Sequence, residues 1–172
     1  MLSVRKLKLK KHKIIAAAAA VILVVIDQLT KYLAATLLKG GGAVTAIPYL
    51  LDLQYSENTG MALGMLKNQR WVFMTLTVVF LCVLMYVFFS KKTTSPLVVY
   101  CITLIVSGGI GNMIDRIFLG YVIDFLDAFF MDYIFNFADC CVVVGCIALA
   151  AVILFKKDAV QNLTDGKQNE NS

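Results

Sequence analysis

Two aspartates in the last third of the chain lie in unusually apolar surroundings, and their residue type could do acid–base chemistry. Asp124 lies in the apolar stretch "YVIDF", and Asp139 begins an apolar run that continues to Phe155. Carboxylates are costly beside lipid, so they usually have a partner or a function there. Two carboxylates held close together cannot both ionise easily, so one of them keeps a proton. Such a pair can activate a water molecule and protonate a leaving amine, which is the chemistry of peptide hydrolysis.

The remaining residues exclude most other hydrolytic chemistries. The one histidine, His12, lies in a basic N-terminal arm. The sequence therefore offers no Ser-His-Asp triad, no Cys-His pair and no histidine-based zinc site within the apolar segments. It also contains no HExxH motif, phosphate-binding loop or dinucleotide fingerprint. We expect no metal and no cofactor, so any chemistry must use carboxylates or a serine paired with a lysine.

The five cysteines all lie within apolar segments, at positions 82, 101, 140, 141 and 146. An odd number without paired spacing in an exposed loop argues against a disulfide framework. The adjacent Cys140 and Cys141 have no histidine nearby, so we interpret them as small core residues and not as metal ligands.

The composition predicts that these candidates belong to a membrane protein. Of 172 residues, 60% are hydrophobic and only 16% are charged, which is too apolar for a soluble domain of this size. A helix needs about 20 apolar residues to cross a bilayer core. Four segments meet or nearly meet this length: 14–38, 71–89, 97–114 and 138–155. We therefore predict an all-α membrane protein with four transmembrane helices and one membrane-embedded domain over residues 1–172.

The distribution of charge predicts how these helices are oriented. Six basic residues precede the first segment, and two lysine pairs, 91–92 and 156–157, follow the second and the fourth. Because cytoplasmic loops are rich in Lys and Arg, both termini are expected in the cytoplasm and Asp139 at the outer boundary. The net charge of +5 then reflects topology and contact with anionic lipid, not nucleic-acid binding. The polar tail at 158–172 is predicted to be disordered.

The first apolar segment contains a charged pair. Asp27 and Lys31 are four residues apart and share one helical face, with the acid first, which is the better orientation. At 1.5 Å per residue, Asp27 lies about 20 Å along the helix from Lys13, in the outer half of the bilayer. We interpret the pair as structural and not as directly catalytic. The apolar pattern continues past it to Leu38, which favours an uncleaved helix over a cleaved secretory signal.

The connection over residues 39–68 is expected outside the membrane. It begins with three glycines and continues through Pro48 into "LLDLQYS", whose partial alternation has some strand character. "ENTGMALG" follows, with Gly60 and Gly64 four residues apart, a spacing that lets backbones approach closely. We expect a small extracytoplasmic β platform here, with Asn58 directed toward the interior.

The third apolar segment ends in "SGGIGNMIDRI". Its three glycines, Gly109 among them, suit tight helix packing or the close passage of a substrate chain. Asn112, Asp115 and Arg116 follow and are expected at the outer surface, where Asn112 and Arg116 share a helical face. One polar residue at a helix end is ordinary, whereas three beside glycines suggest a site.

Polar residues from three helices and two loops map to this same outer boundary. They are Asp27, Asn58, Asn112, Arg116, Asp124, Asn136 and Asp139. A site that faces the outer leaflet explains this convergence better than seven unrelated structural roles. The number of acids does not by itself choose the catalytic pair, because Asp115, Asp127 and Asp132 lie in the same region.

Five sequence blocks, in order over residues 27–139, resemble those of lipoprotein signal peptidases, also called signal peptidase II. The blocks are "DQLTKYL", "ENTGMALG", "GGIGNMIDR", "YVIDF" and "FNFADC". The resemblance implies an aspartic endopeptidase of the bacterial cytoplasmic membrane, with Asp124 and Asp139 catalytic. It would cleave prolipoproteins just before a diacylglyceryl-modified cysteine, in contact with membrane lipid and without an obligate protein partner.

The same resemblance implies supporting or substrate-binding roles for nine further residues. They are Asp27, Lys31, Asn58, Gly60, Gly109, Asn112, Arg116, Asn136 and Ala138. The family's small extracytoplasmic sheet corresponds to the 39–68 connection. The sequence departs from the family at Met61 and Leu63, where many members have Ala and Phe, which changes the contacts expected of that loop.

Other functions remain compatible with the residues. A small transporter could use Asp27 or Asp139 for proton coupling, but the inner halves of the segments carry essentially no charge, which favours a surface site. A Ser/Lys peptidase would use Ser107 or Ser56 with Lys31, and an assembly protein would need no chemistry. For the peptidase, the aromatic loop at 117–135 is a candidate lid.

Overall fold

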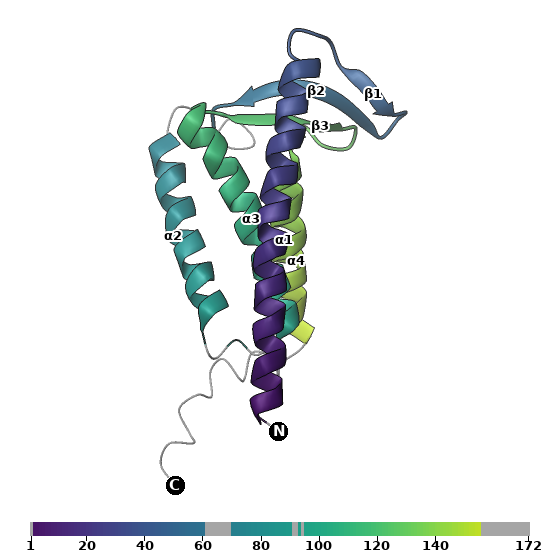
Figure 1. Ribbon diagram of the computed structural model, residues 1–172. Coiled ribbons are helices and arrows are strands. Elements are labelled where there is room, and N and C mark those ends of the chain that lie inside the picture. The colour runs from purple at the N-terminus through teal and green to yellow at the C-terminus, as the bar shows by residue number, and fades with distance from the viewer. Residues whose placement is uncertain (1, 61–69, 91–92, 94, 156–172) are drawn as a thin grey trace.

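The computed structural model describes residues 2–60, 70–90, 93 and 95–155. Within these ranges four helices run roughly along one axis: α1 (Leu2–Leu37), α2 (Arg70–Phe89), α3 (Pro96–Phe118) and α4 (Phe137–Phe155). A small sheet lies across one end of the bundle, and the N terminus lies at the other end (Figure 1). Met61, Leu63 and the tail at 158–172, about which the sequence made predictions, lie outside the described residues.

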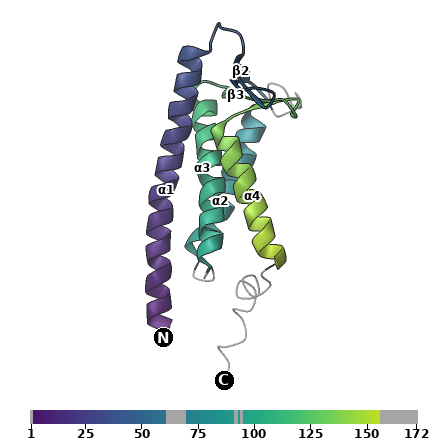
Figure 2. The same ribbon diagram turned by 90° about the vertical axis from the view of Figure 1, so that its right-hand side faces the viewer.

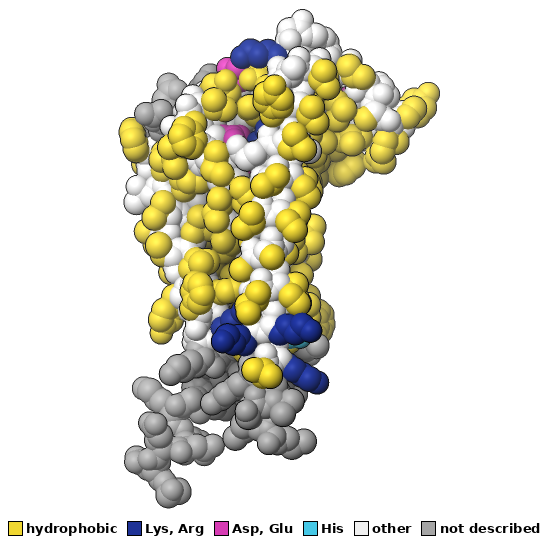
Figure 3. All heavy atoms as spheres, viewed as in Figure 1, with side chains coloured by type: hydrophobic (Ala, Val, Ile, Leu, Met, Phe, Trp, Pro, Cys, Tyr) yellow, Lys and Arg dark blue, Asp and Glu magenta, His cyan; other side chains and the backbone are white. Residues whose placement is uncertain are grey.

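Three of the described helices are long and apolar enough to cross a membrane. Their spans are Leu7–Leu37, Pro96–Phe118 and Phe137–Phe155, while the apolar stretch described in α2, Met74–Phe89, is shorter. Hydrophobic side chains cover the visible surface between the sheet and the N-terminal end, where Lys and Arg side chains gather (Figure 3). These features are those of a multi-pass membrane protein.

The first helix is longer than the predicted segment 14–38. It has 36 residues and begins at Leu2, which corresponds to about 54 Å at 1.5 Å per residue. A bilayer core is only about 30 Å thick, so the basic arm continues the helix beyond the apolar span. Nδ1 of His12 lies 2.9 Å from the hydroxyl of Tyr100, which connects this extension to α3.

The central helix of the bundle is α3, which contacts α1, α2 and α4. Figure 2 shows α3 between α1 and α4. Three glycines make these close approaches possible. A Cβ at Gly108 would overlap the α4 backbone, one at Gly109 would lie 2.8 Å from Leu81 of α2, and one at Gly111 would overlap the carboxylate of Asp27 in α1. The glycines therefore serve helix packing on three sides of α3.

Gly108→Ala is expected to lower the thermal unfolding midpoint and to reduce any activity of the protein. The new methyl group would push α3 away from the first turn of α4, and overpacking typically costs about 1–3 kcal/mol. The matched control is Gly42→Ala, because a Cβ at Gly42 has nothing within 4 Å. Thermal unfolding of both variants in the same detergent measures the difference, and equal midpoints would contradict this packing.

The sheet has four antiparallel strands in the order β1-β2-β3-β4. The strands are β1 (Val44–Ile47), β2 (Leu51–Asn58), β3 (Val122–Ala128) and β4 (Ile134–Phe135). The prediction that residues 39–68 form the platform was incomplete, because the described part of that segment supplies β1 and β2 and the sheet has two more strands. The other half comes from the segment 117–135, which was predicted to be a lid-like loop and instead forms the paired strands β3 and β4.

A hydrophobic cluster fixes β3 on the C-terminal end of α1. Ala34, Ile123 and Phe125 are buried together, and partly buried side chains such as Leu38 and Leu53 pack around them. Burial of a side chain such as that of Ile123 or Phe125 contributes about 1.5–3 kcal/mol to the stability of the fold. The cluster therefore holds the strand that contains Asp124 over the ends of the helices.

Candidate active site

Asp124 lies in the middle of β3, where it is buried with 2% of its surface exposed. Nδ2 of Asn58 donates to its Oδ2 at 2.9 Å, and Nδ2 of Asn136 donates to its Oδ1 at 2.6 Å. Asn58 lies near Asp124 because β2 pairs with β3 in a register that places Ser56 opposite Asp124. Burial raises the pKa of Asp124 to about 6, and the charge of Asp139 adds to the rise, while the two asparagine hydrogen bonds oppose it.

Asp139 belongs to the first turn of α4, as the sequence predicted, and its hydrogen bonds explain why the helix starts there. Oδ1 of Asn136 accepts from the N–H of Asp139 at 3.0 Å, and Oδ2 of Asp139 accepts from the N–H of Asn136 at 3.2 Å. This reciprocal arrangement is a capping box, which satisfies two N–H groups at a helix start. The block "NFAD" is thus a helix-start signal that also carries a candidate catalytic acid.

Two asparagines connect the carboxylates. Asn136 contacts both, since its side chain donates to Asp124 and its backbone N–H donates to Asp139. Asn112 of α3 donates from Nδ2 to Oδ1 of Asp139 at 2.8 Å, and its own Oδ1 accepts from Nδ2 of Asn136 at 3.2 Å. Each carboxylate therefore accepts two hydrogen bonds, within one network drawn from β2, β3, α3 and α4.

Lys31 sets the orientation of this network from α1. It is 1% exposed, and its Nζ lies 2.9 Å from Oδ2 of Asp27, 3.0 Å from Oδ2 of Asp115 and 2.9 Å from Oδ1 of Asn112. An ammonium group has three donors, so these contacts use all of them. Because Lys31 binds the oxygen of Asn112, the amide nitrogen of that residue must face Asp139. The predicted ion pair between Asp27 and Lys31 is present.

Asp27 also caps α4 from a different helix. Its Oδ1 accepts from the N–H of Ala138 at 2.9 Å. The first N–H groups of a helix have no partner within it, and here Asp27 and Asn136 satisfy two of them. Ala138 is 1% exposed and thus contributes a backbone donor and a small side chain where α1, α3 and α4 meet.

The other predicted site residues lie at different distances from the carboxylates. Asn58 accepts the N–H of Gly60 through Oδ1 at 3.0 Å, which fixes its amide toward Asp124. Arg116 donates from Nη1 to the carbonyl of Asn112 at 3.2 Å, and its positive charge lies close enough to both candidate carboxylates to interact with them. Gly109 faces α2, so its role is packing of the bundle.

Asp115 is the main correction to the predicted site. It was expected at the outer surface, but α3 continues to Phe118 and buries it with 3% exposure. Gln28, which the sequence did not single out, donates from Nε2 to Oδ1 of Asp115 at 3.0 Å and lies 3.2 Å from Oδ2 of Asp27. Little in the sequence indicates that Asp115 and Gln28 meet, because their contact depends on where α3 ends and on which face of α3 packs against α1.

The serine–lysine alternative finds no support in the described geometry. The hydroxyl of Ser107 donates to the carbonyl of Leu104 at 3.0 Å, and all three donors of Lys31 are directed at carboxylate or amide oxygens. For the described part of the chain, no group of three or more His, Cys, Asp or Glu residues is placed to hold a metal ion.

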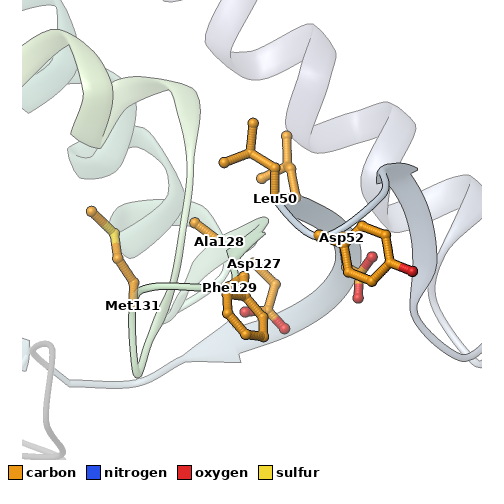
Figure 4. A pocket seen from close by; sticks show the side chains of 8 residues that line it. Leu50, Asp52, Asp127, Ala128, Phe129 and Met131 are labelled. Atoms are coloured by element: carbon orange, nitrogen blue, oxygen red, sulfur yellow. The ribbon is translucent and has the colours of Figure 1, made fainter.

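A separate cavity of about 260 Å³ lies at the far end of the sheet, where β2 begins and β3 ends. Asp52 and Asp127, which are opposite each other in the sheet, line it together with Phe129 (Figure 4). At about 3.3 Å per residue along a strand, Asp127 is about 10 Å from Asp124. Acidic and basic side chains are also visible among the hydrophobic ones near the sheet end of the bundle (Figure 3).

Comparisons with known proteins identify the family of this chain. The family described as signal peptidase (SPase) II matches residues 19–155. A lipoprotein signal peptidase of Caldanaerobacter subterraneus subsp. tengcongensis is 42% identical over 130 residues, which cover 76% of this chain and 89% of that protein. A lipoprotein signal peptidase of Symbiobacterium thermophilum is 39% identical over 99 residues, covering 58% of this chain and 65% of that protein.

A solved structure agrees with these matches. It is described as a bacterial membrane enzyme, is 33% identical in sequence and superposes with a TM-score of 0.75, over 91% of this chain and 93% of that one. The matched range spans the positions of both candidate carboxylates and of the asparagines that connect them. This protein therefore belongs to the signal peptidase II family.

Proposed function

We propose that this protein is an aspartic endopeptidase that removes signal peptides from prolipoproteins by cleaving just before a diacylglyceryl-modified cysteine. One observation carries the proposal: Asp124 and Asp139 accept hydrogen bonds from the same residue, Asn136, in a largely buried network at the end of a helix bundle. The substrate class follows from the relatives, which are named lipoprotein signal peptidases.

In the proposed mechanism the two carboxylates have different protonation states. Asp139 is the ionised partner, because the N-terminal end of a helix favours negative charge. Asp124 is the partner that carries the proton in the reactive form, since burial raises its pKa to about 6 and keeps a protonated fraction near neutral pH. Asp139 takes a proton from water as the water oxygen attacks the scissile carbonyl, and Asp124 donates its proton as the C–N bond breaks and the amine leaves.

The surrounding residues act on these two groups in different ways. Asn112 and Asn136 hold the carboxylates, and Lys31 and Asp27 hold Asn112 and the start of α4. Arg116 supplies a positive charge beside the pair, which can stabilise negative charge that develops on the carbonyl oxygen. These roles need no cofactor.

The proposed topology places this chemistry at the outer leaflet. All four helices cross the membrane, including α2, whose 20 residues correspond to about 30 Å. Both termini are cytoplasmic, because the basic residues gather at the N-terminal end of the bundle (Figure 3). A diacylglyceryl-modified substrate stays in the bilayer, at about 0.8 kcal/mol per buried CH₂ group, so it must reach the carboxylates laterally, under the sheet.

The proposed activity can be tested with purified protein and two forms of one prolipoprotein. One form carries the diacylglyceryl group on its cysteine, and the other has the same sequence without lipid. We expect cleavage of the lipidated form only, with the modified cysteine as the new N terminus. Mass spectrometry of the products identifies the cut. Equal cleavage of both forms would contradict the proposed substrate, and no cleavage of either would contradict the proposed function.

Asn58→Ala is expected to move the alkaline limb of the kcat/KM profile to higher pH. The hydrogen bond from Asn58 favours the ionised form of Asp124, so its loss raises the pKa of that carboxyl above about 6. The protonated acid then persists to higher pH, by roughly 0.7 pH unit for a lost hydrogen bond of about 1 kcal/mol. Thr59→Ala, at the exposed neighbouring position, is the control. A limb that stays in place or moves down would contradict the assignment of Asp124 as the acid.

A further inference from the structure

Asp115 is a buried carboxylate that the proposed chemistry does not use, yet it touches both sides of the site. Its Oδ2 accepts from the backbone N–H of Ile123 at 3.1 Å and lies 3.0 Å from Nζ of Lys31. Its Oδ1 accepts from Gln28 at 3.0 Å. These partners belong to two other elements, Ile123 to β3 and both Lys31 and Gln28 to α1, while Asp115 itself belongs to α3.

These contacts reach the two candidate catalytic residues by separate routes. Ile123 immediately precedes Asp124, so the bond to its N–H fixes the backbone of β3 beside that carboxylate. On the other route, Asp115 holds Lys31, Lys31 holds the oxygen of Asn112, and Asn112 donates to Asp139. A shift of Asp115 would therefore act on Asp124 and on Asp139 through different contacts and change their relative placement.

We propose that Asp115 is a positioning residue that sets the placement of Asp124 relative to Asp139, through Ile123 on one side and through Lys31 and Asn112 on the other. The inference rests on the proposed function, since it assumes that these two carboxylates react together. It assigns Asp115 no contact with substrate.

The chemistry of the position requires a carboxylate. Three donors converge on Asp115, from Lys31, Ile123 and Gln28, and an ionised carboxylate can accept from all of them. The amide of an asparagine has only one oxygen. In one orientation its NH₂ group would face the amide NH₂ of Gln28. In the other it would face the ammonium of Lys31 and the backbone N–H of Ile123. Asp115→Asn is therefore close in shape but loses at least one contact.

The test compares Asp115→Asn with Asp132→Asn, a matched change at an exposed aspartate in the β3–β4 loop. Cleavage of the lipidated prolipoprotein is measured across pH for purified, folded enzyme. We expect kcat to fall about 10- to 100-fold in Asp115→Asn, as for a small misplacement of reacting groups, with KM within about threefold. Loss of this negative charge also favours ionisation of the pair, so the alkaline limb of kcat/KM should move to lower pH. Asp132→Asn should match the wild type.

A second readout does not depend on cleavage. Hydrogen exchange of the peptide that covers residues 120–128 should be faster in Asp115→Asn than in the wild type, because a neutral amide oxygen holds the N–H of Ile123 less strongly than a carboxylate, or not at all. If the wild type fails to cleave any substrate, the proposed function fails, and exchange still reports whether Asp115 holds β3. Exchange rates equal to those of Asp132→Asn would overturn the inference.

Two further outcomes would also overturn it. In the first, the activity of Asp115→Asn falls at every pH in proportion to the fraction of folded protein, and the alkaline limb of kcat/KM does not move. Such a loss would be purely structural. If Asp115→Asn does not fold, Gln28→Met decides, since it removes one donor to Asp115 and leaves the charge. We expect a severalfold lower kcat for Gln28→Met, and a kcat equal to that of the wild type would overturn the inference.

Discussion

Replacement of Asp124 or Asp139 by asparagine is expected to lower cleavage of a lipidated prolipoprotein by at least about 10³-fold. Each substitution removes one of the two proton-transfer steps, and the remaining acid cannot serve as both base and acid in the same step. Loss of groups that act as a unit is strongly non-additive, so the double variant should be hardly worse than either single one. Rates are compared for purified enzyme under single-turnover conditions.

The fold should survive these substitutions. Asparagine has nearly the shape of aspartate. At either position its one side-chain oxygen can still accept a hydrogen bond from a neighbouring asparagine. We expect the thermal unfolding midpoint to change by only a few degrees. Asp127→Asn, at the cavity on the far end of the sheet, is the control for loss of an acid on the same strand. More than about a tenth of the wild-type rate in either variant at Asp124 or Asp139 would move the catalytic pair elsewhere.

Lys31→Met is expected to have the largest effect on stability. The substitution leaves two buried carboxylates, Asp27 and Asp115, without their counter-charge, and removal of one partner from a buried ion pair typically costs about 3–5 kcal/mol. Activity should fall as well, because Asn112 loses the contact that turns its amide toward Asp139. Thermal unfolding in detergent and cleavage per folded enzyme measure the two effects separately.

The control for this prediction is Lys39→Met. Lys39 and Glu57 form an ion pair at 2.9 Å, but both side chains are exposed, and exposed pairs contribute little to stability. The unfolding midpoint of Lys39→Met should therefore remain near that of the wild type. A serine–lysine peptidase predicts a different pattern, in which Lys31→Met stays folded but inactive while Asp124→Asn keeps some activity. That pattern would contradict the carboxylate mechanism.

The helices were the more predictable part of the fold, because each is a long apolar run between charged or glycine-rich segments. The sheet was only half predictable. In β3, Val122, Ile123, Asp124 and Phe125 are all buried, so the strand shows no alternation of polar and apolar residues. Its partner β2 lies more than sixty positions earlier in the chain, and no local pattern announces such a pairing.

The parts of the candidate site that depend on side-chain type were easier to predict than the contacts that depend on how the helices pack. The carboxylate pair with its asparagines was predicted from the resemblance to the family, since the number of acids alone did not choose the pair. The contact of Asp27 with α4 could not be predicted, because its donor is the backbone N–H of Ala138, which any residue but proline provides. Asp115 was misplaced because its burial depends on the continuation of α3 to Phe118, and helix ends are hard to locate from sequence.

The most direct measurement is intact-mass spectrometry of a diacylglyceryl-modified prolipoprotein after incubation with the wild type, Asp124→Asn and Asp139→Asn at equal concentrations of folded enzyme. If the two carboxylates act as a pair, the wild type will release the signal peptide with the cut just before the lipidated cysteine, and both variants will leave the substrate intact. Release of the same peptide by either variant at a rate near that of the wild type would contradict this mechanism.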